Sequence, residues 1–130
     1  MRNWKLLSAA GVLVLAAAAP QATQQEAVSV EIAIGTNITD RMPTDTGSAF
    51  PTTVGSLVCW TKVTGAADTK ITHVWTHGPH SATVELNIGG SPWRTYSRRT
   101  IPAEWTGEWT VEVKDSAGTV LATKKFTVGG

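Results

Sequence analysis

The sequence predicts an all-β protein, an immunoglobulin-like antiparallel β-sandwich of about seven strands preceded by a cleavable signal peptide. Short segments of alternating residues recur along the chain, and the breaks between them carry Gly, Pro or Asp. Beyond the first nineteen residues there is no helical periodicity. Turns at intervals of about eight to twelve residues are typical of two-sheet sandwiches.

The N-terminal segment has the layout of a secretory signal peptide. Two early cations, Arg2 and Lys5, precede a weakly polar run that ends at Ala19, and this run is shorter than the about 20 apolar residues of a membrane span. Ala16 and Ala18 fit the Ala-x-Ala cleavage pattern. We therefore expect residues 1–18 to be a signal peptide, 19–27 a polar leader and 28–130 one domain, with a periplasmic or secreted product. Membrane attachment is expected only if the signal segment is retained.

The strands follow from local patterns. Aliphatic residues alternate from Val28 to Ile34, and period two predicts a half-buried strand. The Thr-, Asp-, Gly- and Pro-rich segment 35–55 predicts a long loop. In the last two strands, Trp109 and Val111 share a face and a turn at 115–118 predicts a hairpin. The strands after the loop, including these last two, are expected at 56–64, 69–77, 82–88, 93–101, 107–115 and 119–128.

Charge and cysteine content exclude some classes of function. The eleven Lys and Arg residues fall to nine without Arg2 and Lys5, and they face ten Asp and Glu. This near-neutral balance lacks the basic surface that binds phosphates, so no nucleic-acid partner is expected. Cys59 is the only cysteine, so no intramolecular disulfide can form. Its apolar neighbours predict a small buried hydrophobe, and it precedes Trp75 by sixteen residues, near the spacing in immunoglobulin domains.

Three histidines, His73, His77 and His80, lie within eight residues. On one strand His73 and His77 would stand about 13 Å apart, because the rise is about 3.3 Å per residue, and one metal ion cannot span that distance. His73 shares a face with Trp75, so we expect it to be buried, neutral and bonded to a backbone carbonyl. A two-residue turn would set His77 opposite His80. This pair predicts either a solvated hairpin tip or two ligands of a zinc or copper ion.

The tetrapeptide Asp45-Thr46-Gly47-Ser48 matches the active-site sequence of aspartic proteases. Such enzymes pair two of these carboxylates, whereas this chain has one copy, preceded by Met42-Pro43-Thr44 instead of a hydrophobic strand. Only a homodimer could supply the pair. We therefore expect neither an enzyme nor a cofactor.

The segment 91–100, SPWRTYSRRT, is the most favourable candidate for a binding surface. Arg94, Tyr96 and Arg98 alternate onto one face, with Trp93 on the other. Planar guanidinium groups that flank a phenol can hold a carboxylate, a sulfate or the face of a sugar. Trp105, in a polar turn, would add an exposed aromatic platform.

The same residues also have a purely structural interpretation. Trp93 and Trp109 could fill the core and Trp105 could cap one end of the sandwich, because large aromatics usually fill cores in domains without disulfides. The arginines would then be solvated or paired with Glu108 and Glu112.

Several motifs together resemble one family. They are HVW at 73–75, GGSPWRTYS at 89–97 and the run from Trp105 to Val128, with Asp40-Arg41-Met42-Pro43 and CWTKVTG upstream. Over roughly 28–128 the chain resembles the bacterial domain-of-unknown-function family 2914, whose members look like small exported β-domains. The resemblance implies no activity; its pattern includes His73, Trp75, Arg94, Ser97, Trp105, Gly107 and Trp109 but neither His77 nor His80.

The expected function is therefore that of an exported, non-catalytic binding or interaction module. Its ligand would be an envelope glycan or a partner protein, bound by Arg94, Tyr96, Arg98 and Trp105. The alternative is a periplasmic copper- or zinc-binding protein that uses the hairpin of His77 and His80.

Overall fold

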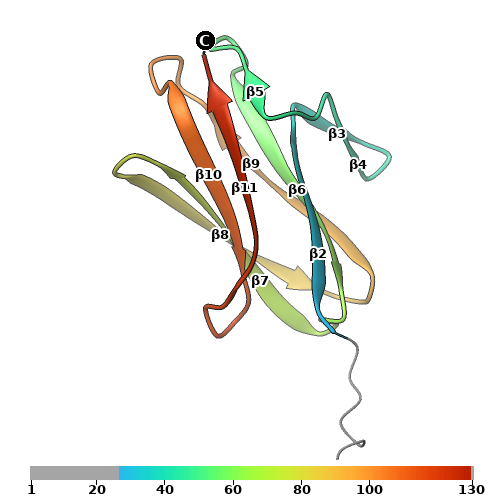
Figure 1. Cartoon of the computed structure of the whole chain (residues 1–130). Helices are drawn as coiled ribbons and strands as arrows, with labels where there is room; N and C mark the ends of the chain where they lie inside the picture. Colours follow the sequence, from blue (N-terminus) through green and yellow to red (C-terminus); the bar gives the residue numbers. More distant parts are fainter. Residues whose placement is uncertain (1–26, 130) are drawn as a thin grey trace, which may run out of the picture.

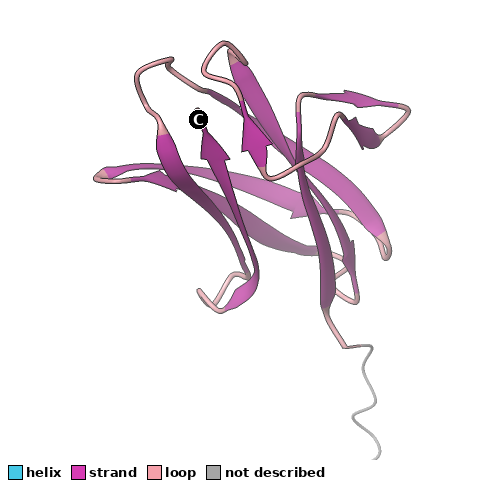
Figure 2. Cartoon of the chain, turned by 45° about the horizontal axis from the view of Figure 1, so that its top comes forward, coloured by secondary structure: helices cyan, strands magenta, loops and turns pink. Residues whose placement is uncertain are grey.

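The computed structural model describes residues 27–129, which form ten strands and no helix (Figure 2). The predicted signal peptide lies outside the described residues, as does the leader except for Ala27. Within the described part, no helix is long and apolar enough to cross a membrane.

The strands form two facing sheets and a small hairpin (Figure 1). The larger sheet has the order β5 (Ala49–Phe50), β11 (Val120–Val128), β10 (Gly107–Lys114), β7 (Thr69–His77) and β8 (His80–Ile88). The smaller sheet has the order β2 (Ser29–Gly35), β6 (Ser56–Thr64) and β9 (Trp93–Thr100), and β3 (Asn37–Thr39) pairs with β4 (Met42–Thr44). All neighbours are antiparallel except β5 and β11, which run parallel.

The core lies between the two sheets. Cys59 of β6 and Trp75 of β7 belong to one buried cluster, which also holds Trp109 and Phe126. The Phe126 ring meets Trp75 edge-on at 6.2 Å and stacks on Trp109 at 5.8 Å between centroids. Cys59 is a free, buried thiol, and burial raises its pKa to about 12. It therefore packs as a small hydrophobe, as its apolar neighbours predicted.

The predicted strands 56–64 and 69–77 coincide with β6 and β7, but the prediction of a long loop at 35–55 is wrong. This segment contains β3, β4 and β5. Thr39 pairs with Met42 around a two-residue turn whose residues, Asp40 and Arg41, both have positive φ, 53° and 66°. This is the conformation of a type I′ hairpin turn. Phe50 then pairs with the end of β11.

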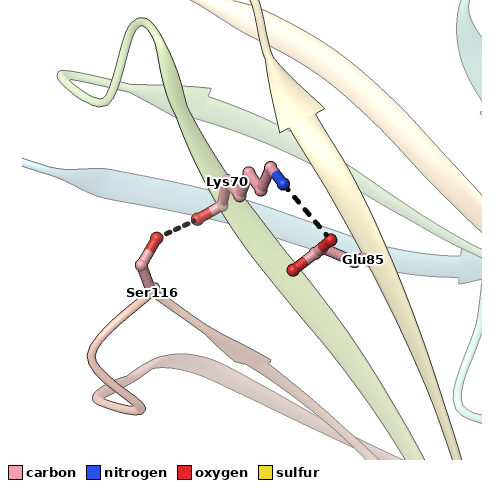
Figure 3. A network of polar contacts seen from close by, with 3 residues as sticks. All are labelled: Lys70, Glu85 and Ser116. Carbon is pink, nitrogen blue, oxygen red and sulfur yellow. Dashed lines mark hydrogen bonds and ion pairs between the residues drawn. The ribbon is translucent and has the colours of Figure 1, made fainter.

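A polar network ties the β10–β11 turn to the larger sheet (Figure 3). The hydroxyl of Ser116 donates to the carbonyl of Lys70 at 3.3 Å, and the Lys70 ammonium lies 3.5 Å from Glu85 on β8. Both charged side chains are largely exposed, so this ion pair contributes little to stability.

Candidate ligand-binding cleft

The outward face of β6 is covered rather than open. Leu57, Cys59 and Val63 point into the core, so the alternating residues Val58 and Trp60 point outward. Both are nevertheless buried, and Trp60 is only 5% exposed. The β3–β4 hairpin provides the cover, because the indole Nε1–H of Trp60 donates to the carbonyl of Arg41 at 2.8 Å.

Gly35 allows the hairpin to fold back onto the sheet. A Cβ atom at this position would lie 2.5 Å from the carbonyl oxygen of Thr44. The same carbonyl accepts a hydrogen bond from the amide of Thr36 at 2.9 Å. The close approach of β4 to the end of β2 therefore requires a residue without a side chain.

A cleft of about 640 Å³ opens between this hairpin and β9. Its volume falls within the range of about 300–1,000 Å³ that is usual for small-molecule sites, which are mostly apolar with a few polar groups. The hairpin, the outer face of the smaller sheet and the loop before β9 contribute its lining: Ile38, Arg41, Trp60, Pro92, Trp93, Arg94, Thr95 and Tyr96.

Three of these residues are aromatic, and two of them are open to solvent. Trp60 forms a buried part of the lining, whereas Trp93 is 40% exposed and Tyr96 is 46% exposed. The Trp93 ring packs over Gly89, where a Cβ atom would lie 3.0 Å from the ring. The glycines of the Gly-Gly-x-x-Trp motif thus make room for this ring.

The expectation that Trp93 is a core residue is wrong, because it is 40% exposed and lines the cleft together with Arg94. Its strand face is as predicted, because Trp93 pairs with the inward-facing Val63 and Arg94 pairs with Lys62. Trp93 is the first residue of β9, and Gly89 and Gly90 beneath its ring carry no side chains that could cover it.

Two arginines, Arg41 and Arg94, also line the cleft. Among the described residues, neither takes part in an ion pair. Glu108 pairs with Lys125 and Glu112 with Lys114, so the pairing of these glutamates with arginines is wrong. The glutamates lie on β10, in the other sheet.

Arg98 lies on the same strand face as Arg94 and Tyr96 but does not line the cleft. Its guanidinium donates to the hydroxyl of Ser56 at 3.2 Å and to the side-chain oxygen of Asn37 at 3.0 Å. The Arg98 guanidinium is therefore already hydrogen-bonded within the protein. Of the three residues predicted on this face, only Arg94 and Tyr96 line the cleft.

Trp105 lies in a separate cluster. Its amide bonds back to Pro102 at 3.0 Å, and its ring packs against the core, stacked on His80 with 3.9 Å between centroids. Arg99 lies 5.7 Å from the centroid of the same ring. Trp105 thus covers one end of the core and is not part of the surface that bears Arg94 and Tyr96.

His77 and His80 are paired across the β7–β8 turn, as the spacing predicted. The His77 ring is held, because its Nε2 lies 2.7 Å from the carbonyl of Thr106 and can only donate there. Nδ1 of His77 is buried and has no hydrogen-bond partner among the described residues. No group of three or more His, Cys, Asp or Glu side chains placed to hold a metal ion occurs in residues 27–129.

His73 is fully buried, as predicted, but its partners are hydroxyl groups and not a backbone carbonyl. Nδ1 lies 2.7 Å from the Ser97 hydroxyl and Nε2 lies 3.2 Å from the Thr61 hydroxyl. Ser97 also accepts the indole N–H of Trp75 at 3.0 Å, and Thr61 donates to the carbonyl of Thr95 at 3.4 Å. One neutral tautomer satisfies this chain, with Ser97 donating to Nδ1 and Nε2–H donating to Thr61.

Asp45 of the protease-like tetrapeptide is exposed, and its carboxylate accepts a hydrogen bond from the Thr36 hydroxyl at 3.0 Å. Its φ of 50° places it in the left-handed region, which Asp tolerates better than most residues. The structure gives this carboxylate a local role at the end of β4.

Residues 68–128 match the family described as "Protein of unknown function (DUF2914)". The predicted family is confirmed for this segment. The DUF2914 segment runs from just before β7 to the end of β11 and includes one wall of the cleft, Pro92 to Tyr96. Arg41 and Trp60 on the other side lie upstream of it.

Solved structures with some likeness to the chain are β-glucosidases. One from Listeria innocua in complex with glucose has 13% identity and a TM-score of 0.40, with 79% of this chain and 16% of that chain covered. One from Kluyveromyces marxianus in complex with glucose has 13% identity and a TM-score of 0.43, with 80% and 14% covered. The alignments thus span less than a fifth of either enzyme. No curated protein matches the chain.

Proposed function

We propose that the protein is an exported, non-catalytic binding module whose ligand occupies the cleft between the β3–β4 hairpin and β9. The observation that carries the proposal is the juxtaposition of Arg41 and Arg94, which take part in no ion pair within residues 27–129, with the exposed rings of Trp93 and Tyr96. Trp, Tyr and Arg are the residues that most often dominate binding energy.

The location and the fold class complete this proposal. The signal-peptide pattern of residues 1–18 favours a periplasmic or secreted protein, so the ligand would be a glycan or a protein of the cell envelope. An immunoglobulin-like sandwich is favoured by the two-sheet arrangement and by the packing of Cys59 and Trp75 in one core cluster.

The test is capture of envelope glycans and proteins by the purified protein and by two variants. Tyr96→Ala removes an exposed ring of the cleft, and Val120→Ala truncates an apolar side chain of similar exposed fraction, 45%, on the other sheet. We expect Tyr96→Ala to reduce capture at least tenfold without lowering the melting temperature, and Val120→Ala to bind like the wild type. Equal capture by all three proteins would remove the cleft from the proposal.

A second candidate function is supported by the state of His77. Histidines that bind metals usually donate their other ring N–H to a carbonyl or carboxylate. His77 donates to the carbonyl of Thr106, and its Nδ1 has no partner among residues 27–129. A zinc or copper ion held by His77 and His80 would need a further ligand from a loop or a second chain. Titration calorimetry with zinc and copper(II) tests this candidate: no heat, or the same heat in the His77→Ala, His80→Ala double variant, would reject it.

A further inference from the structure

We infer that the cleft binds an acidic saccharide, a short oligosaccharide in which at least one ring carries a carboxylate. This inference rests on the proposed function and specifies its ligand class. It follows from the charge of the lining, the backbone conformation of Arg41 and the placement of the aromatic rings.

The lining is positively charged. It contains two arginines and no acidic residue. Lys62 of β6 is paired in register with Arg94, while Glu31 of β2 is paired with Lys62 on the side away from β9. Unpaired guanidinium groups that face a confined space select a carboxylate, sulfate or phosphate, because they can form two parallel charge-assisted hydrogen bonds to it.

Arg41 occupies a position where glycine would be more favourable. It is the second residue of the type I′ turn and has a φ of 66°, a conformation that is costly for most side chains and free for glycine. Strained residues of this kind cluster at functional sites. The Arg41 carbonyl accepts a hydrogen bond from Trp60, which the carbonyl of any residue could do. What the arginine side chain adds at this position is a second positive charge beside Arg94 in the lining.

The aromatic rings favour a sugar over a simple anion. An inorganic anion would engage the arginines and leave the rings of Trp93 and Tyr96 exposed. A sugar ring has an apolar C–H face that packs on an aromatic face, and the negative face of the aromatic ring favours this contact. Trp93 is already held against Gly89 and Gly90, so little ordering is required on binding.

The cleft is less suited to an extended peptide. Peptides that bind β-proteins commonly add a strand to a free sheet edge. β9 is an edge strand of the smaller sheet, but the cleft extends over the face of the sheet toward β6, with Trp60 in its lining, and not along the free edge of β9. The volume of about 640 Å³ suits a ligand of small-molecule size.

The experiment measures affinity by calorimetry for tetrasaccharides of galacturonic, glucuronic and mannuronic acid. The methyl ester of each is the matched neutral probe. We expect the wild-type protein to bind at least one acid at least tenfold more tightly than its ester, with an affinity that falls as salt is added.

Arg41→Gly is the decisive variant, because glycine relieves the conformational cost of the turn. We expect at least a tenfold loss of affinity for the acid and a melting temperature that is not lowered. Lys125→Ala, a largely exposed cation on β11 in the other sheet, is the control and should bind like the wild type. An Arg41→Gly variant that binds normally would overturn the role of the guanidinium.

The outcomes separate this inference from the proposed function. Equal affinity for acid and ester, lost in Tyr96→Ala, would overturn the acidic ligand and keep the binding module. Binding of peptides with a free C-terminal carboxylate in place of the saccharides would overturn the saccharide. Failure of all these probes, with capture from the envelope still dependent on Tyr96, would overturn the inference alone, and failure of both experiments would overturn the proposed function as well.

Discussion

Acidification should destabilise the fold through His73. The side chain is fully buried between the sheets, and burial lowers its pKa from 6.5 to about 4. In the unfolded chain the imidazole regains its ordinary pKa of about 6.5. Between these two values the unfolded state binds more protons than the folded state, so stability falls as the pH falls. The effect vanishes about one pH unit above 6.5, where His73 is neutral in both states.

The expected size follows from the same two pKa values. One pKa unit corresponds to about 1.4 kcal/mol, so the difference between 6.5 and about 4 amounts to about 3 kcal/mol in total. About 2 kcal/mol of this should be lost by pH 5. Small domains have about 5–15 kcal/mol of stability in all, so the loss is large enough to measure.

The assay is urea unfolding, followed by tryptophan fluorescence, at about pH 7.5 and about pH 5 for the wild type and His73→Gln. Glutamine retains hydrogen-bonding groups but does not titrate. The variant should be less stable at the higher pH and should lose about 2 kcal/mol less on acidification. His77, His80 and the carboxylates are present in both proteins, so their contributions cancel in the comparison. An identical loss in both proteins would refute the reasoning.

Three further changes test the core and the hairpin. Ser97→Ala removes a hydroxyl that serves two buried ring nitrogens and should cost about 2–5 kcal/mol in urea unfolding; a change below about 0.5 kcal/mol would contradict the network. Cys59 should resist thiol reagents in the native protein and react once urea unfolds it, because burial raises its pKa to about 12; fast native labelling would show that the thiol is accessible. Gly35→Ala brings a Cβ atom 2.5 Å from the Thr44 carbonyl and should lower the melting temperature by several degrees, since about 1 kcal/mol corresponds to about 4–8 °C in a small domain. Gly47→Ala is its control, because a Cβ atom at Gly47 would meet no other atom within 4 Å, and this variant should melt near the wild type.

The long strands were predictable because their residues alternate over a sufficient length. β6 and β7 each have nine residues in which every second side chain faces the core, and most of these are apolar, with Thr61 and His73 as the buried polar exceptions. β3, β4 and β5 have only two or three residues, too few for a period to be read. The β3–β4 turn also lacks the Asn-Gly or Asp-Gly signal of such hairpins, since Asp40 is followed by Arg41.

Half of the cleft was predictable and half was not. Arg94 and Tyr96 follow from alternation along one strand, whereas Arg41 and Trp60 reach the cleft only through the folding of a hairpin onto a sheet. One signal for Trp60 was present: the run from Leu57 to Trp60 is apolar at every position. A strand that is apolar on both faces is covered on both faces, which implies an element over the outside of β6.

The network around His73 also bears on the proposed binding surface of β9. The Ser97 hydroxyl bonds to His73, and the Thr95 carbonyl accepts a hydrogen bond from Thr61, which also bonds to His73. Arg94 and Tyr96 alternate with these residues along the strand and line the cleft. The inner hydrogen bonds fix the strand, so the outer side chains start from a defined position and lose less freedom on binding.

This division accounts for most of the residues that carry the family resemblance. His73, Trp75 and Ser97 form the inner network, Trp105 and Trp109 pack at one end of the core, and Gly107 has a φ of 94° that side chains disfavour. Each of these positions is explained by folding. Arg94 is different, because it is exposed, lines the cleft and takes part in no ion pair within residues 27–129. Since folding does not explain Arg94, its guanidinium is the part of the pattern that most directly indicates a ligand.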